Sequence, residues 1–300
     1  MKLAVVAHSG KTFGGGLPEL RRTLAHAGIP SPLWFEVPKS KRAPGAVERA
    51  LEEGAELIVA WGGDGLVRRC VNALGNTQIP LAVCPAGTSN LFATNLGIER
   101  DIGKAVETAL HGDRRRLDVG RFNGERFAVM AGAGLDAAMI KGADDLKERL
   151  GRAAYVLAGA ANLNAPSFEA KVKVDGRRWY KGAASCILVG NVGDLFGGIE
   201  VFADAHPDDG MLDVGVLTSD GPVQSLRAVS RTALGSAEKS PYVRVTQGRS
   251  LKVKLDRKVR YELDGGDRKK VKSFKVDIEA GAITVCVPRA APGGDESDDN

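Results

Sequence analysis

One stretch decides the fold, Glu56-Leu57-Ile58-Val59-Ala60-Trp61-Gly62-Gly63-Asp64-Gly65, which runs on into Leu66 to Leu74. Residues 56–60 are mostly apolar and predict a buried strand. Residues 62–65 predict a tight loop, and residues 66–74 predict a helix. A strand, a glycine turn and a helix in this order form the repeating unit of a parallel sheet with crossover helices.

The rest of the first third of the chain repeats this unit. Strands are also predicted at Leu3 to Ala7, Leu33 to Val37 and Ile79 to Cys84. Helices are predicted at Leu17 to His26, Ala46 to Glu53 and Asp101 to Leu110, and in a segment that ends at Leu96. We therefore expect an α/β domain over residues 1–120, with small-residue turns at the strand ends where such sheets bind ligands.

After about residue 115 the pattern changes to short strands separated by turns. The predicted strands are Glu169 to Val174, Trp179 to Val189, Leu212 to Leu217, Arg249 to Leu255 and Ala282 to Val287. Asp-Gly pairs at 175–176, 209–210 and 264–265 favour antiparallel hairpins. Helical stretches are predicted at Asp144 to Leu163 and Val223 to Leu234. We expect a mostly antiparallel β domain over residues 121–289 and a disordered acidic tail over 290–300.

The charge distribution narrows the class of partner. The chain has a net charge of +5, and four acids near its end leave the remainder at +9: Asp295, Glu296, Asp298 and Asp299. A basic body suits polyphosphate ligands and anionic membrane surfaces, and nucleic acid would explain the charge equally well. Because no recognised nucleic-acid-binding module is present, we expect no nucleic-acid partner.

The apolar runs are short. Leu3 to Ala7 and Leu57 to Trp61 are too brief for a signal sequence or a membrane span. We expect a soluble, cytoplasmic protein that contacts the inner face of the membrane peripherally. Four cysteines without paired spacing are expected to be reduced and buried: Cys70, Cys84, Cys186 and Cys286.

The glycine loop at residues 62–65 has the composition of a phosphate-binding turn. Its glycines allow backbone N–H groups to approach phosphate oxygens, and a helix N-terminus follows. Asp64 would repel phosphate unless a bridging Mg²⁺ lies between them, so Asp64 is a candidate metal ligand. The alternative is a plain tight turn capped by Asp64.

Two other strand ends carry polar turns. In Pro85-Ala86-Gly87-Thr88-Ser89-Asn90, either Thr88 or Ser89 caps the next helix, or Thr88 and Asn90 contact a nucleotide. Ser9-Gly10-Lys11-Thr12 resembles the end of a P-loop, but Val5 stands where that motif needs glycine. It is therefore either a small phosphate-facing turn or a simple strand-end turn.

These motifs occur in a characteristic order with three others. The others are Leu117-Asp118-Val119-Gly120, Pro207-Asp208-Asp209-Gly210 followed by Leu212-Asp213-Val214, and Leu263-Asp264-Gly265. From residue 3 to 288 the chain resembles the diacylglycerol kinase catalytic-domain family, which includes bacterial lipid kinases and sphingosine kinases. The resemblance implies an N-terminal domain that holds ATP, a β-sandwich-like C-terminal domain, and catalysis in the cleft between them.

The resemblance also implies roles for single residues. The positions that contact the nucleotide are matched here by Gly62, Gly63, Asp64, Gly65, Leu66, Thr88 and Ser40. Asp264 matches the general base that accepts the proton of the lipid hydroxyl. Asp209 matches a Mg²⁺ ligand, assisted by main-chain carbonyls at His206 and Met211, and Asp118 matches an acid of the wider metal network.

Some positions depart from the family pattern. Leu66 replaces a threonine, Ala7-His8 replaces Asn-Pro, Leu91 replaces a frequent acid, and Gly266 replaces a glutamate. These changes remove acidic and hydroxyl groups around the metal, while the aspartates that the family uses remain in place.

The sequence therefore predicts an ATP- and Mg²⁺-dependent kinase that phosphorylates a hydroxyl of a diacylglycerol-like lipid. One alternative is an NAD kinase-like enzyme, although Asn162 and Asn191 lack the acidic neighbour that family uses. Another is a non-catalytic regulatory protein that binds lipid or nucleotide, which Leu66 and Gly266 suggest. The identity of the acceptor lipid stays open, as does the oligomeric state, a homodimer included.

Overall fold

The computed structural model describes residues 1–134, 167–194, 201–218 and 243–289. The two helical stretches predicted at 144–163 and 223–234, and the predicted acidic tail, lie outside the described residues.

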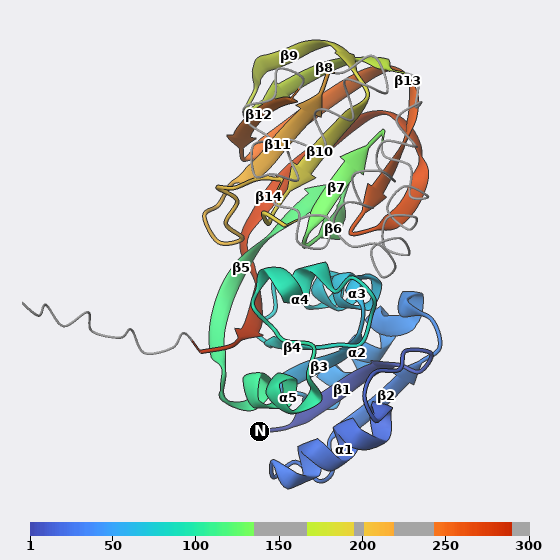
Figure 1. Cartoon of the computed structure of the whole chain (residues 1–300), viewed down its shortest axis with the longest axis vertical. Helices are drawn as coiled ribbons and strands as arrows, with labels where there is room; N and C mark the ends of the chain where they lie inside the picture. Colours follow the sequence, from blue (N-terminus) through green and yellow to red (C-terminus); the bar gives the residue numbers. More distant parts are fainter. Residues whose placement is uncertain (135–166, 195–200, 219–242, 290–300) are drawn as a thin grey trace, which may run out of the picture.

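The N-terminal domain is a parallel sheet with helices on both faces (Figure 1). Its strands are β1 (Leu3–His8), β2 (Leu33–Val37), β3 (Leu57–Gly62) and β4 (Leu81–Pro85), in the order β4-β3-β1-β2. Its helices are α1 (Gly16–His26), α2 (Ala43–Glu52), α3 (Asp64–Leu74), the short α4 (Leu91–Asn95) and α5 (Ile102–His111), with the 3₁₀ turn η1 (Ser40–Arg42). The predicted alternation of strand and helix is confirmed.

Burial on both faces explains why β1, β3 and β4 are almost entirely apolar, whereas β2, at the end of the strand order, includes the exposed Glu36. Along β1, Ala4 and Val6 pack against α2 and α3, while Val5 and Ala7 pack against α1 and α5. All four cysteines are buried free thiols, as expected. Burial raises the pKa of Cys70 and Cys84 to about 12, so these thiols stay protonated and unreactive.

The C-terminal domain is mostly antiparallel. Its strands are β5 (Asp113–Phe122), β6 (Glu125–Phe127), β7 (Met130–Ala133), β8 (Phe168–Val174), β9 (Arg177–Ala184), β10 (Cys186–Gly190), β11 (Leu212–Leu217), β12 (Val243–Gly248), β13 (Ser250–Leu263) and β14 (Gly266–Val287). The hairpins at Asp175-Gly176 and Asp264-Gly265 have left-handed backbone at both residues, as two-residue Asp-Gly turns require.

The single strand predicted at Trp179 to Val189 was wrong in one respect, because it forms two strands. β9 pairs with β8, whereas β10 pairs with β7 and β11, so the chain changes partners at Ser185. The predicted strand at Ala282 to Val287 is the end of β14, which is 22 residues long.

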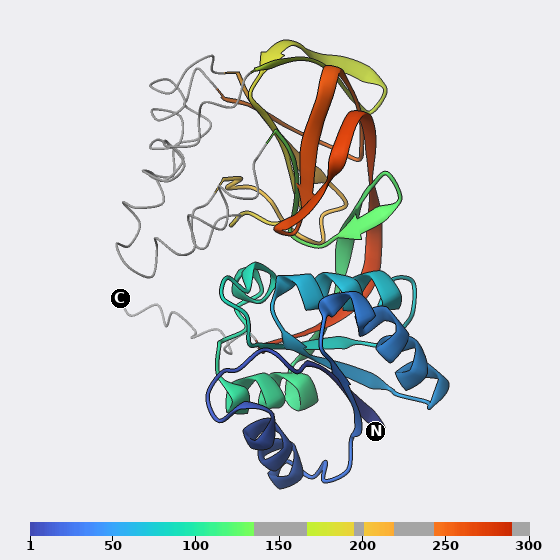
Figure 2. The same cartoon turned by 90° about the vertical axis from the view of Figure 1, so that its right-hand side faces the viewer.

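Two long strands connect the domains (Figure 1). β5 runs antiparallel to β14 along most of its length, and Val285 of β14 pairs with Leu81 of β4 in the N-terminal sheet. Figure 2 shows the two domains stacked end to end, with the β8–β9 hairpin at the end far from the N-terminal domain. The domain limits at residues 120 and 289 stay a prediction, since β5 and β14 belong to both halves.

Candidate functional site

The first glycine loop joins β3 directly to α3. The carbonyl of Gly63 accepts hydrogen bonds from Leu66 and Val67 N–H at 2.9 and 3.1 Å, so the helix starts without an intervening loop. Leu66 is 1% exposed, and a Cβ on Gly62 would lie 2.6 Å from its Cδ2 atom. The leucine that replaces the family's threonine is thus a core residue that packs over the end of β3.

The second loop, residues 85–90, packs backbone to backbone against the first. A Cβ on Gly87 would lie 2.5 Å from the Cα of Gly63, so only glycine permits this approach. Asn90 has a left-handed φ of 48°, and its side-chain amide accepts from Gly87 N–H and donates to Gly87 C=O, both at 2.9 Å. The amide of Asn90 therefore holds the loop in shape.

Asp64 links the two loops. Its Oδ1 atom accepts the backbone N–H of Phe92, at the start of α4, at 3.0 Å. Thr88, in the second loop, is exposed, and the Oγ of Ser40 lies 3.8 Å from where a Cβ on Gly65 would stand. The structure thus brings together the predicted nucleotide-binding residues of three segments.

The turn after β1 lies at the same carboxyl edge of the sheet. Ser9 N–H donates to Val37 C=O at 3.0 Å, and Gly10 N–H donates to the Nδ1 of His8 at 3.1 Å. Trp61 Nε1 donates to Lys11 C=O at 3.1 Å, which ties this turn to the end of β3. Three strand-end turns therefore meet at one edge, where open α/β sheets bind their ligands.

Asp264 is a buried carboxylate held by backbone donors. It lies in the β13–β14 turn, is 6% exposed, and accepts N–H bonds at 2.9 Å from Ala128, Val129 and Met130. Its own N–H donates to Met130 C=O at 2.9 Å. Burial raises its pKa to about 6, although the three N–H donors act in the opposite direction.

Glu262, two residues earlier, is a second buried carboxyl group, which the sequence analysis missed. It is 0% exposed, and its Oε2 atom accepts Gly265 N–H at 2.7 Å. Burial and, secondly, the nearby charge of Asp264 raise its pKa to about 8, so Glu262 is neutral at pH 7. Strand alternation would place Glu262 on the face opposite Tyr261 and Leu263, so no sequence signal indicated its burial.

An ion-pair cluster connects helix α3 to the second domain. Glu125 of β6 binds Arg68 of α3 and Arg268 of β14, with Oε1 at 2.5 Å from each guanidinium. Arg268 and Arg68 hold the pKa of Glu125 down at about 2. The positive charge of Arg68 also lowers the pKa of Asp264, which opposes the effect of burial.

Three buried side-chain atoms have no hydrogen-bond partner among the described residues: Arg68 Nε, Asn191 Oδ1 and Glu262 Oε1. All belong to residues around Asp264. Asn191 donates to the carbonyl of Ala128, whose N–H binds Asp264. Buried polar atoms of folded proteins are nearly always paired, so this concentration marks a candidate functional site.

Asp118 organises the loop that carries the other predicted metal ligands. It is 4% exposed, and its two carboxylate oxygens accept the N–H groups of Gly210 and Gly281 at 2.6 Å. Its own N–H donates to Pro207 C=O at 2.6 Å. Asp118 thus holds the 206–211 loop against the bulge in β14.

Within that loop, Asp209 is engaged with its neighbours. Its Oδ1 accepts Met211 N–H at 2.8 Å, and its N–H lies 3.5 Å from His206 C=O. Across residues 1–134, 167–194, 201–218 and 243–289, no three carboxylate, histidine or cysteine side chains gather as a metal site. The metal roles of Asp64, Asp118, His206, Asp209 and Met211 stay predictions.

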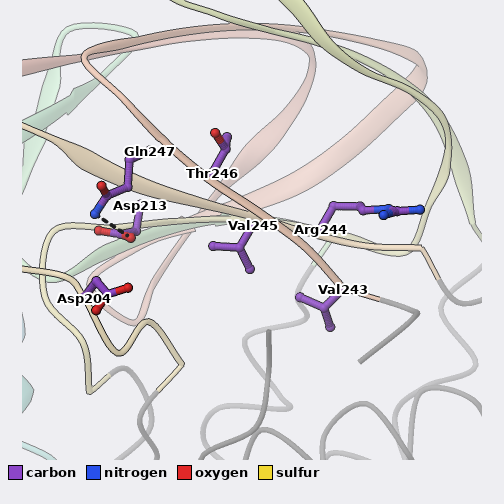
Figure 3. Close-up of a pocket in the computed structure, with 7 residues that line it drawn as sticks. All are labelled: Asp204, Asp213, Val243, Arg244, Val245, Thr246 and Gln247. Carbon is purple, nitrogen blue, oxygen red and sulfur yellow. Dashed lines mark hydrogen bonds between the residues drawn. The ribbon is translucent and has the colours of Figure 1, made fainter. Parts of the chain in front are cut away.

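A separate hollow of ≈ 480 Å³ lies along the edge strand β12 (Figure 3). Asp213 and Gln247 meet there, with Gln247 Nε2 donating to Asp213 Oδ1 at 3.2 Å, while Arg244 points away from both (Figure 3). The hollow contains none of the predicted site residues, so the glycine loops and Asp264 remain the candidate site.

Residues 2–122 match the family described as "Diacylglycerol kinase catalytic domain". Residues 129–287 match the "YegS C-terminal NAD kinase beta sandwich-like domain". A curated relative named "Diacylglycerol kinase", from Bacillus subtilis (strain 168), is 35% identical over 228 residues, which cover 73% of this chain and 74% of the relative.

The chain belongs to the diacylglycerol kinase family. It is therefore an enzyme of the kinase class, as the ordered motifs predicted.

Solved structures show the same fold. A crystal structure of a diacylglycerol kinase from Bacillus anthracis str. Sterne has a TM-score of 0.74 at 21% identity, and the match covers 95% of this chain and 96% of that one. An NAD kinase from Archaeoglobus fulgidus in complex with ATP has a TM-score of 0.51 at 13% identity, covering 95% and 93%. The expected fold class, a parallel α/β domain with a β-sandwich-like second domain, is confirmed.

Proposed function

We propose that this kinase transfers the γ-phosphoryl group of ATP, in the presence of Mg²⁺, to a hydroxyl of a diacylglycerol-like lipid. In this reaction the hydroxyl oxygen bonds to the γ-phosphorus, ADP leaves, and the hydroxyl proton needs an acceptor. The observation that carries the proposal is the position of Asp264, a buried carboxylate held rigidly by three backbone N–H groups.

Asp264 has the properties of a general base. An ionised carboxylate offers about four lone-pair sites, and three of those on Asp264 are used by N–H donors, which leaves one for the proton. A pKa of about 6 leaves the group ionised at pH 7 and close enough to that pH for proton transfer. The three donors also hold the carboxylate in one orientation.

The two glycine loops would hold the nucleotide. The backbone of Gly62 to Gly65 lies at the N-terminus of α3, with Ser40 near Gly65 and Gly87, which precedes Thr88, packed against Gly63. The segment from Ser9 to Gly10 borders the same edge of the sheet.

The oxygen donors present fit Mg²⁺, which is commonly held by one or two carboxylates plus substrate phosphates. Asp64 would hold it at the nucleotide. In the second domain, Mg²⁺ would be held by Asp209 and by the main-chain oxygens of His206 and Met211, with Asp118 behind them. When bound, the ion neutralises charge that develops on the phosphoryl oxygens.

Two alternatives remain testable. An NAD kinase-like activity is supported by the fold alone, since the NAD kinase structure is 13% identical. A regulatory protein without turnover is suggested by Leu66 and Gly266. Leu66 replaces a hydroxyl by a buried side chain, while the neighbouring Asp64 and the distant Asp264 are retained.

A phosphotransfer assay with γ-labelled ATP separates these functions. The acceptors would be diacylglycerol, monoacylglycerol, a sphingoid base, ceramide, phosphatidylglycerol and a polyprenol in mixed micelles, with NAD as the soluble alternative. We expect label in one lipid, and a fall of about 10²–10⁴-fold in Asp264→Asn with nucleotide binding retained. Label in NAD alone, or ATP binding without any transfer, would refute the proposal.

We also propose that the enzyme works at the inner membrane surface without crossing the bilayer, because its substrate resides there. None of the helices in the part of the chain that the structure describes is long and apolar enough to span a membrane. A homodimer is compatible with this proposal, and sedimentation would determine the oligomeric state.

A further inference from the structure

One face of the C-terminal domain is covered by cations from four neighbouring strands. We call it the lysine face, and it consists of Lys171 and Lys173 on β8, Arg178 and Lys181 on β9, Lys252 and Lys254 on β13, and Lys275 on β14. All seven side chains are exposed.

The alternation of the strands places these cations on a single face. Along β8, Ala170 and Val172 are buried in the second core while Lys171 and Lys173 are exposed. β13 follows the same pattern, with Leu251, Val253 and Leu255 inside. Because side chains alternate between the faces of a sheet, the exposed lysines of adjacent strands lie next to one another.

The register of the strands sets like charges directly opposite. In one row Lys181 pairs with Lys171, which pairs with Lys254. In the next row Arg178 pairs with Lys173, Lys173 with Lys252, and Lys252 with Lys275. Like charges at such positions destabilise a sheet, so folding alone gives no reason for this arrangement.

Few of these charges are neutralised by the protein. Among the described residues, Lys275 alone of the seven forms an ion pair, with Asp277 at 2.8 Å. Glu169 and Asp256 lie on the borders of the face. By contrast, several arginines of β5 and β6 are paired, such as Arg115 with Asp208 at 2.7 Å and Arg126 with Glu279 at 2.5 Å.

We propose that the lysine face docks the enzyme onto an anionic membrane, and this inference rests on the proposed function because the lipid acceptor resides in the membrane. The face is a sheet surface spread over four strands, which suits a planar array of headgroups. Six of its seven cations are lysines. Lysine acts as a point charge on a flexible stem, whereas geometrically specific phosphate recognition in nucleic acids favours the arginine fork.

The lysine face is remote from the proposed catalytic group. The β14 partners of Lys254 and Leu263 are Ser273 and Gly266, which are seven residues apart and so about 20 Å apart along that strand. Substitutions in the face should therefore leave turnover of a short-chain, fully dispersed acceptor unchanged.

The test is sedimentation of the full chain with vesicles of phosphatidylcholine alone or mixed with phosphatidylglycerol. One variant neutralises Lys173, Lys252 and Lys254 to glutamine. The control neutralises three exposed cations of the N-terminal domain to glutamine, Arg22, Arg100 and Lys104. Both variants lose the same net charge, so any difference between them reports the location of the charge.

We expect the wild type to bind the anionic vesicles alone, with binding that weakens as salt is added. The lysine-face variant should bind on the order of 100-fold more weakly, and the control variant less than 5-fold more weakly. The lysine-face variant should also be at least as stable to thermal unfolding as the wild type, because like charges have been removed.

Three results would each overturn the proposal. They are equal vesicle binding by the two variants, no binding of anionic vesicles by the wild type, and tighter binding of the wild type to duplex DNA than to the vesicles. Failure of the proposed function is seen separately. In that case the vesicle result stands as expected while no lipid accepts label from ATP.

Discussion

The neutrality of Glu262 leads to a prediction about stability. The pKa of Glu262 is raised from 4.5 to about 8 in the folded protein, so the folded state holds this proton more tightly than the unfolded chain does. Its contribution to the unfolding free energy is therefore fully present below about pH 4.5 and is lost as the pH rises to about 8. Over that window the wild type should lose about 5 kcal/mol of unfolding free energy through this group.

Glu262→Gln should abolish most of this loss. Glutamine has the same shape and stays uncharged, and its amide oxygen can accept the Gly265 N–H that Oε2 accepts at 2.7 Å in the wild type. At pH 4.5 we expect the two proteins to differ by about 1 kcal/mol or less, the usual worth of a single hydrogen-bond rearrangement. At pH 8 the variant should be the more stable by several kcal/mol.

Urea unfolding of the wild type and the variant between pH 4.5 and 8.5 measures this difference. Glu48→Gln is the matched control, because Glu48 is exposed on α2. Its curve should follow the wild-type curve throughout. Parallel curves for wild type and Glu262→Gln would refute the reasoning, since they would mean that Glu262 ionises inside the fold without a penalty.

Three further predictions concern the site. The kcat/KM for phosphotransfer should rise with pH through about 6, because Asp264 accepts a proton only when ionised. Gly87→Ala should weaken nucleotide binding at least about tenfold by calorimetry, since its Cβ would lie 2.5 Å from the facing backbone, whereas Gly45→Ala meets nothing within 4 Å. Glu125→Ala should lower the unfolding free energy, measured by urea unfolding, by about 1–3 kcal/mol, because it leaves Arg68 buried without its partner. The loss is smaller than for a fully buried ion pair because Glu125 itself is partly exposed.

Each of these has a clear contrary result. A pH profile that is flat between 5 and 7 would remove Asp264 as the base whose ionisation limits the rate. Equal ATP affinities for Gly87→Ala and Gly45→Ala would show that the loop contact does not shape the nucleotide site. An unchanged urea midpoint for Glu125→Ala would show that Arg68 finds another partner or water.

The fold followed from local pattern because the relevant signals are local. Apolar runs such as Leu57 to Trp61, each followed by a small-residue turn and a helix, predicted the buried parallel strands of the N-terminal domain. The Asp-Gly pairs at 175–176 and 264–265 specified their hairpins because both residues adopt left-handed backbone readily. The hairpin predicted at 209–210 was wrong, because residues 201–211 form turns and bends and supply no strand to pair across that turn with β11. The break between β9 and β10 at Ser185 was not predictable from the sequence. It arises because β9 pairs with β8 while β10 pairs with β11, and that choice depends on strands distant in the sequence.

The sequence by itself determined the family and the identity of the aspartates, since ordered motifs such as residues 62–65 and 263–265 are read directly. What surrounds Asp264 was decided by tertiary structure alone. Its three N–H donors come from residues about 135 positions earlier, and the roles of Glu262 and Arg68 depend on burial and on charges from other strands. The lysine face likewise exists only because strand register sets Lys173 opposite Lys252. Electrostatic environment is a property of distances between residues remote in sequence, and those distances exist only once the chain has folded.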